Sequence, residues 1–360
     1  MKNTCLILGA GFSKSIGNLP VTKEMYLAFQ NVMGKERKKN KRRFRWGEEI
    51  MKFIEELEND FLKIPYSKIE KNGIILESNY YENFEGLCSF IDLNLAFEVH
   101  ALCEHKGERA DLSNKSMFAK YTMSKLKEIR GFIGNYLYLT LIDDKSNEEL
   151  LNKFYYSFIK DCSSIVTFNY DLILEKYLYK KEVWFPKDGY GFSSQKIPEI
   201  NSSFSNSISS AKILKMHGSL NWQPPSLFQS KMNFRWFDDY GNYFFPGYLR
   251  AEEKHNQYLG AFMPVGFILP SWIKQFQYPE IIEVWNEAFK AISKADEIIF
   301  IRYSLPRSDT AVHTLFSSID FDNKEIKLYD PNANDLLEHY SYIIRKNKIE
   351  IFPHYLEEYL

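Results

Sequence analysis

Two short apolar runs of the sequence end in polar residues that could take part in chemistry. Asn169 and Asp171 follow the run at 165–167, and His217 follows the run at 213–216. A neutral imidazole can accept a proton near neutral pH, while an amide and a carboxylate can orient a sugar hydroxyl or a water. These three residues are therefore candidate catalytic residues. For Asn169 and Asp171 the alternative is an Asx turn and a helix cap.

His217 differs from the other histidines in its sequence context. It stands between Met216 and Gly218, and the glycine would leave room for a ligand beside the imidazole. The remaining histidines lie in segments that are typical of helices or loops: His100, His105, His255, His313, His339 and His354.

A glycine-rich turn, Gly9-Ala10-Gly11, follows the first apolar run at 4–8. Backbone N–H groups in such a turn can approach a phosphate, and the dipole of a following helix favours an anion. The full dinucleotide fingerprint would have a third glycine where this chain has Lys14. A purely structural turn therefore stays open as the alternative. No GxxxxGK[ST] motif is present, which excludes a P-loop nucleotidase.

Alternating strands and helices would have to position these residues. We expect strands at 4–8, 165–167, 213–216, 297–301, 326–329 and 349–352, and an amphipathic helix at 281–292. This alternation favours an α/β fold with a Rossmann-like, doubly wound parallel sheet. In such sheets ligands bind at the carboxyl ends of the strands, where the polar residues named above lie.

The stretch 25–160 has a different pattern, with apolar residues at helical spacing such as Leu87, Ile91 and Leu95. We expect a large helical insertion at 25–160, within a core built from 1–24 and 161–360. The insertion contains the run KERKKNKRRFR at 35–45, with eight basic residues and one acidic residue. A solvated face is the favoured interpretation, and a contact with nucleic acid, a nucleotide or an acidic partner is the alternative.

Composition narrows the class of protein. The chain has 360 residues, 45% hydrophobic and 26% charged, which excludes wholesale disorder. Its net charge of -1 argues against a globally basic nucleic-acid binder. Its four cysteines form no CxxC pair, so we expect neither structural zinc nor a disulfide framework. No signal peptide and no membrane-spanning apolar run is recognisable, and we expect a cytoplasmic protein.

Five motifs taken together suggest a family. They are GAGFS at 9–13, TFNYD at 167–171, HGS at 217–219, the run from LPSW (269–272) to IIFIRYSLPRSD (298–309), and YDPN at 329–332. In this order they resemble the sirtuin-like superfamily, and more closely its bacterial branch of NAD-consuming antiphage defence proteins. Two features depart from that pattern. Arg302 stands where branch members often have glycine, and the four-cysteine zinc module of protein-deacylating sirtuins is missing.

The resemblance implies roles for individual residues. Asn169 and Asp171 would face the nicotinamide ribose and amide, and His217 would be the catalytic histidine. The NAD diphosphate would be held by Gly9, Ala10, Gly11, Phe12 and Ser13, and the adenosine side would be lined by Tyr303, Ser304 and Asp330.

The resemblance also implies an activity. We expect an NAD glycohydrolase (NADase) that cleaves NAD+ to nicotinamide and ADP-ribose as an abortive-infection effector. ADP-ribosyl transfer, deacylation and non-catalytic sensing of NAD or ADP-ribose stay open as alternatives. Unrestrained NAD hydrolysis would poison the cell, so we expect control by homo-oligomer assembly or by a separate partner such as a ring-forming ATPase.

Overall fold

The computed structural model describes residues 2–21, 145–192, 208–223 and 278–360, the last range without 308 and 347, and shorter pieces between these ranges. The chain divides into two compact units. The first consists of Met1–Leu19, Leu141–Ile268 and Lys274–Leu360, and the second of Pro20–Thr140 and Leu269–Ile273.

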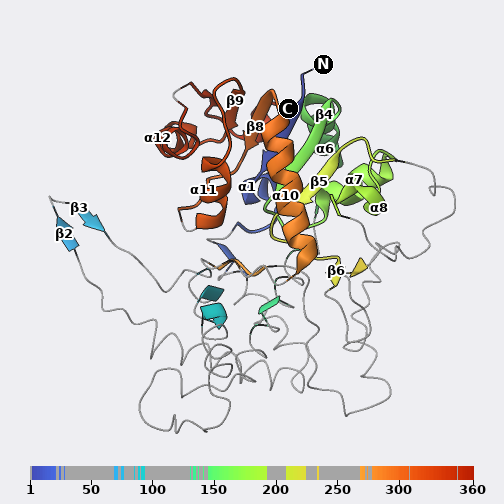
Figure 1. Cartoon of the computed structure of the whole chain (residues 1–360), viewed down its shortest axis with the longest axis horizontal. Helices are drawn as coiled ribbons and strands as arrows, with labels where there is room; N and C mark the ends of the chain where they lie inside the picture. The colour runs from blue at the N-terminus through green and yellow to red at the C-terminus, as the bar shows by residue number, and fades with distance from the viewer. Residues whose placement is uncertain are drawn as a thin grey trace, which may run out of the picture. The chain divides into compact units, whose positions relative to one another are not determined.

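The first unit contains a six-stranded sheet (Figure 1). Its strands are β1 (Thr4–Leu8), β4 (Cys162–Thr167), β5 (Lys212–Lys215), β8 (Glu297–Ile301), β9 (Glu325–Tyr329) and β10 (Glu350–Phe352). Their order is β10-β9-β8-β1-β4-β5, and all neighbours are parallel. The chain adds β4 and β5 on one side of β1 and then crosses to β8 on the other side. This order confirms the predicted Rossmann-like, doubly wound α/β fold.

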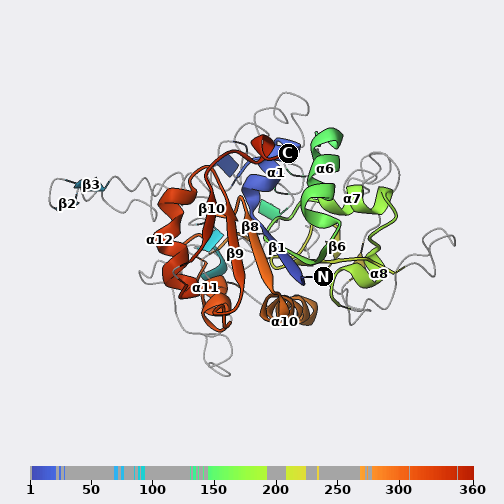
Figure 2. The ribbon, with the colours of Figure 1, turned by 90° about the horizontal axis from the view of Figure 1, so that it is seen from above.

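The central strands are apolar along most of their length because both faces of the sheet are covered. In β1, Cys5, Leu6, Ile7 and Leu8 are all buried. Figure 2 shows α10 (Pro279–Lys294) on one side of the sheet, and α1 (Ala10–Gly17) and α6 (Glu148–Phe154) on the other. Helix α10 buries Ile281, Val284, Ala288 and Ile292, which recur every three or four residues as the sequence pattern at 281–292 predicted.

The first unit contains further helices. They are α7 (Ile173–Lys180), α8 (Pro186–Gly189), α11 (Thr310–Ser317) and α12 (Ala333–Ile344), with a π-helical turn at Tyr155–Ile159 after α6 and a 3-10 turn at Leu356–Glu358. Helix α6 starts at Asn147, whose side chain accepts hydrogen bonds from Glu149 N at 3.0 Å and Leu150 N at 3.2 Å.

The second unit is described only in pieces. Cys88, Ile91, Ile133 and Leu137 are helical and buried, as their spacing predicted. The antiparallel pair β2 (Ile69–Lys71) and β3 (Ile74–Leu76) differs from the helical expectation. Asn72-Gly73 between the two strands is a strong hairpin signal, and it outweighs helical spacing over so few residues.

Other expectations are tested only in part. The basic run at 35–45 lies outside the described residues, and the limits 25 and 160 of the expected insertion stay a prediction. In the aromatic-rich stretch after β5, two short antiparallel strands are described, β6 (Trp222–Gln223) and β7 (Asn233–Phe234).

Candidate active site

The parallel register brings the candidate residues to one end of the sheet. Leu8 of β1 pairs with Thr167 of β4 and with Ile301 of β8. The ladder extends one step further, because Phe168 N donates to Leu8 O at 3.2 Å and Gly9 N donates to Ile301 O at 3.1 Å. The turns that follow β1, β4 and β8 therefore meet at the carboxyl ends of these strands, where doubly wound folds bind ligands.

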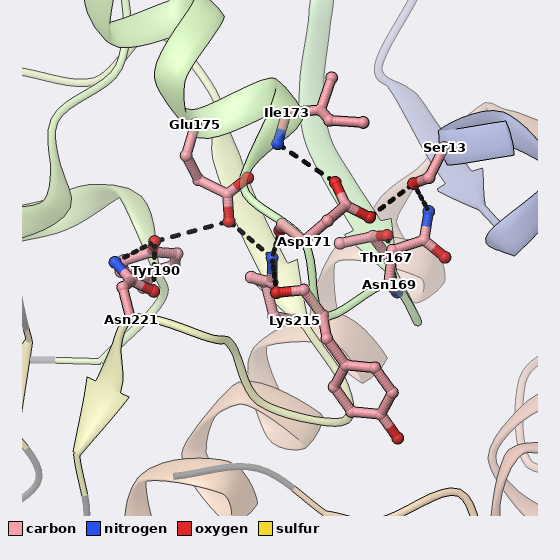
Figure 3. A network of polar contacts seen from close by, with 10 residues as sticks. Ser13, Thr167, Asn169, Asp171, Ile173, Glu175, Tyr190, Lys215 and Asn221 are labelled. Carbon is pink, nitrogen blue, oxygen red and sulfur yellow. Dashed lines mark hydrogen bonds and ion pairs between the residues drawn. The ribbon is translucent and has the colours of Figure 1, made fainter. Parts of the chain in front are cut away.

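Asn169 links the turn after β4 to the turn after β1 (Figure 3). Its Nδ2 donates to Gly9 O at 2.9 Å and to Ser13 Oγ at 2.8 Å. The Ser13 hydroxyl in turn donates to Asp171 Oδ2 at 2.6 Å. Four of the candidate residues, with Gly9 contributing its carbonyl oxygen, are thus joined in one buried chain of hydrogen bonds.

These contacts fix the orientation of the Asn169 amide. Gly9 O can only accept a hydrogen bond, so the nitrogen of the amide has to face it. The oxygen, Asn169 Oδ1, is buried and has no hydrogen-bond partner among the residues that the structure describes. A buried acceptor without a donor is costly unless a ligand or water supplies one.

The carboxylate of Asp171 is fully engaged within the protein. Oδ2 accepts from Ser13, and Oδ1 accepts from Ile173 N at 3.1 Å. The second bond closes an Asx turn, which is the alternative that the sequence left open for this residue. In this structure Asp171 therefore holds Ser13 and the start of α7.

A second buried network, centred on Lys215, contacts the same turn (Figure 3). Lys215 Nζ contacts Glu175 Oε1 at 2.7 Å and donates to the carbonyl oxygens of Tyr170 and Asp171. Tyr190 OH lies 3.5 Å from Glu175 Oε1 and is hydrogen-bonded to the side chain of Asn221. Burial raises the pKa of Glu175, and the adjacent Lys215 ammonium counteracts that shift. The lysine holds the two peptide groups that flank the Cα atom of Asp171.

Gly9, which follows β1, and Gly11, in the first turn of α1, are both required by packing. A Cβ at Gly9 would lie 2.5 Å from Arg302 O, and one at Gly11 would lie 2.9 Å from the Arg302 Cβ. Phe12 is 1% exposed and its ring packs on Phe154 at 4.8 Å between centroids, so its side chain belongs to the core. Only its backbone is left for the diphosphate contact that the resemblance implied.

His217 is buried at the carboxyl end of β5. Its ring contacts those of Phe168, at 5.3 Å between centroids, and Tyr170, at 6.0 Å. Burial lowers its pKa, the Lys274 ammonium lowers it further, and Asp309 acts in the opposite direction. The net shift is downward, so the imidazole is neutral at physiological pH, as a proton acceptor has to be.

Asp309 and Lys274 are neighbours of His217 that the sequence analysis missed as site residues. Asp309 Oδ2 lies 3.3 Å from His217 Nε2 and 3.5 Å from Lys274 Nζ. Asp309 also caps α11, accepting from Val312 N at 3.4 Å. An Asp directly before a helical pattern is recognisable as a cap, but nothing in the sequence points from it to His217.

The residues expected on the adenosine side lie at the ends of β8 and β9. The Tyr303 ring stacks on Phe168 at 4.4 Å, and Ser304 is exposed. Asp330 is buried, with Oδ1 accepting from Asn332 N at 2.9 Å and Oδ2 lying 3.7 Å from the Arg302 guanidinium.

Arg302 has a left-handed backbone, with φ of 53°. A glycine adopts this conformation without strain, which agrees with the glycine that the family pattern described above implies at this position.

The described part of the chain contains no group of three or more His, Cys, Asp or Glu side chains that could hold a metal ion. None of its described helices is long and apolar enough to cross a bilayer. The zinc-free state of the protein stays a prediction.

Comparison with known proteins gives one match by sequence. A family model described as a SIR2-like domain matches residues 163–264, a range that contains Asn169, Asp171 and His217. No curated protein matches the chain. The family match supports the resemblance to the sirtuin-like superfamily.

Solved Sir2 structures are similar at low identity. A mutant of a Sir2 homologue in complex with ADP-ribose has a TM-score of 0.41 and 11% identity, over 99% of this chain and 88% of that chain. A Sir2 homologue in complex with NAD has a TM-score of 0.40 and 11% identity, over 99% of this chain and 86% of that chain. Because TM-scores below 0.5 do not establish a common fold, the fold assignment rests on the strand order given above.

Proposed function

We propose that the protein is an NAD glycohydrolase, which cleaves NAD+ to nicotinamide and ADP-ribose. The observation that carries the proposal is the fixed amide of Asn169, whose buried Oδ1 receives no hydrogen bond from the described part of the chain. The ribose hydroxyls of NAD and an attacking water are donors of the required kind. The match to a SIR2-like domain over this segment supports NAD as the ligand.

The proposed binding mode follows the topology of the sheet. The diphosphate would lie at the start of α1, where the helix dipole favours an anion. The nicotinamide ribose would lie toward Asn169 and His217, and the adenosine toward Tyr303, Ser304 and Asp330. Asp171 would act through Ser13, which it holds against the Asn169 amide.

The proposed reaction needs little acid catalysis. Nicotinamide leaves as a neutral molecule, because the electron pair of the breaking glycosidic bond returns to its cationic ring nitrogen. The ribose passes through an oxocarbenium-like state, and a water oxygen then bonds to its anomeric carbon. Asn169 Oδ1 would orient that water or a ribose hydroxyl, and His217 would accept the proton that the water releases.

The biological setting is proposed from the sequence motifs alone. We place the enzyme in the cytoplasm as an antiphage effector without zinc. Its activity would be controlled by homo-oligomer assembly or by a separate partner such as a ring-forming ATPase. Nucleic acid is a further candidate partner, through the run at 35–45.

The proposal is tested by incubating the purified protein with NAD and separating the products by chromatography. Equal amounts of nicotinamide and ADP-ribose are expected, and both should be lost in His217→Gln. Binding of NAD without any release of nicotinamide would favour a non-catalytic sensor. Nicotinamide release that requires an acylated peptide would favour a deacylase. Nicotinamide release that leaves ADP-ribose attached to protein would favour a transferase.

A further inference from the structure

We infer that Asp309 is a positioning residue for His217, and that Lys274 balances the charge of Asp309 so that the imidazole stays neutral until it accepts a proton. The inference rests on the proposed function of the same site and adds the two residues that set the proton affinity of its base.

The geometry of the three side chains carries this inference. Asp309 Oδ2 is shared between His217 Nε2 at 3.3 Å and Lys274 Nζ at 3.5 Å. The three side chains are between 7% and 10% exposed, so solvent screens their charges little. Buried charges are tolerated only when they are paired, and here one carboxylate and one ammonium pair with each other.

Charge balance explains why the histidine is neutral at rest. With Asp309 ionised and Lys274 protonated, the cluster carries no net charge only if the imidazole is neutral. Burial alone would raise the pKa of Asp309, but His217, Lys274 and Val312 N together lower it to about 2. The carboxylate is therefore ionised throughout the physiological range. When His217 accepts a proton, this carboxylate stabilises the imidazolium that forms, as in other His–carboxylate pairs.

The two charged neighbours act on the proton affinity of His217 with opposite sign. Burial and Lys274 disfavour the protonated imidazole, whereas Asp309 and a hydrogen bond with the Phe168 backbone favour it. The other groups packed on the ring are the aromatic side chains of Phe168 and Tyr170, and the Tyr170 hydroxyl donates to Ile268 O at 2.7 Å. Removing one charge at a time should therefore move the titration of His217 in opposite directions.

The local structure allows a clean substitution at Asp309. The residue also serves as the N-cap of α11. Asparagine is an equally good N-cap, since its side-chain oxygen can accept from the same backbone N–H. Asp309→Asn removes the charge and keeps the cap, whereas Asp309→Ala removes both. Because the substitution also replaces the oxygen that faces His217 by an amide NH2, an effect of Asp309→Asn on His217 reports the loss of the charged acceptor and not the loss of the cap.

The test is a titration of His217 followed by NMR of the histidine ring, which needs no turnover of NAD. The His217 signal is assigned by its loss in His217→Gln. Relative to wild type, Asp309→Asn should lower the pKa of His217 and Lys274→Gln should raise it, each by about one unit. Asp320→Asn is the matched control, because its carboxylate accepts from Asp322 N at 2.9 Å on an exposed turn. It should leave the signal unchanged.

Kinetics give a second readout. Loss of kcat/KM at acidic pH, caused by protonation of His217, should move to lower pH in Asp309→Asn and to higher pH in Lys274→Gln. In Asp309→Asn, kcat should fall about tenfold or more with KM nearly unchanged, since a positioning residue acts on the chemical step.

Each outcome has a distinct meaning. Titrations of His217 that do not move, or that move in the same direction in both variants, would overturn the inference. If the two variants show the opposed titration shifts but the wild-type protein never cleaves NAD, the proposed function is contradicted, whereas the inference about the charges around His217 is still supported.

Discussion

The side chain of Asn169 shows how one residue can serve both the fold and the proposed reaction. Its amino group ties the turn after β4 to the turn after β1, and its oxygen is left for a ligand. The motif TFNYD identified Asn169 and Asp171 as candidates of equal weight. The structure separates them, because Asp171 forms the Asx turn, whereas Asn169 Oδ1 has no donor within the described ranges.

Replacing Asn169 by alanine should reduce NAD cleavage by about a hundredfold or more, because the orienting acceptor is lost. It also removes donors from two buried acceptors and should cost about 1–3 kcal/mol of unfolding free energy. Steady-state kinetics and urea denaturation measure the two effects.

Asn221→Ala is the matched control for that loss of stability. Asn221 is also a buried asparagine, and its amide bonds Tyr190 OH at 3.0 Å. We expect a similar loss of stability with turnover close to wild type. Equal turnover in Asn169→Ala and Asn221→Ala would exclude Asn169 from the reaction.

Ser13→Ala distinguishes two roles for this hydroxyl. The structure uses it to bridge Asn169 and Asp171, and the resemblance implied that it contacts the diphosphate. Loss of the bridge should lower kcat, by about tenfold, with KM nearly unchanged. A raised KM with normal kcat would instead favour the diphosphate contact.

At the scale of elements, the strands were predictable and the contacts between their loops were not. Continuous apolar runs marked β1 and β8 at their observed limits, because strands buried on both faces have no polar positions. The approach of Asp309 and Lys274 to His217 depends on how the segment after β8 and the segment before α10 pack on β5. The sequence pattern within each segment does not predict how the segments pack on β5, so the contacts of His217 could not be predicted from it.

Lys215 provides a test of how β5 supports the turn after β4. Its side chain is 1% exposed and pairs with Glu175, which is 2% exposed. Lys215→Met leaves the Glu175 carboxylate buried without its partner and should cost about 3–5 kcal/mol of unfolding free energy. It also frees the carbonyl groups of Tyr170 and Asp171, so turnover should fall with stability.

Lys212→Met is the matched control on the same strand. Lys212 pairs with Glu287 at 2.7 Å, but its side chain is 44% exposed. Exposed pairs contribute about 0–1 kcal/mol, so urea denaturation should show a small change. If the two variants unfold at the same urea concentration, the buried pair is not what holds the turn.

At the scale of the whole molecule, binding of NAD can be separated from its cleavage. His217→Gln should still bind NAD, since the other proposed contacts are intact, and it should not consume the ligand. NAD at about 100 times its Kd should then stabilise the fold by about 2.7 kcal/mol, which thermal unfolding measures. Nicotinamide alone should stabilise it less, because it cannot reach the turn after β1. An unchanged unfolding temperature with NAD would argue against the proposed site.

Control of the activity is the last property that we predict for the whole molecule. An enzyme that hydrolyses NAD without restraint would deplete its own cell, so turnover should depend on assembly or on a partner. Closed symmetric assembly is the usual form of soluble oligomers. We expect turnover per molecule to change with protein concentration, in parallel with the size measured by light scattering. Replacing Lys38, Lys39, Arg42 and Arg43 by glutamine should leave turnover unchanged once the assembly state is matched, because the run at 35–45 is remote in sequence from every proposed site residue. A monomer with constant turnover at all concentrations, with and without added partner, would contradict control by assembly.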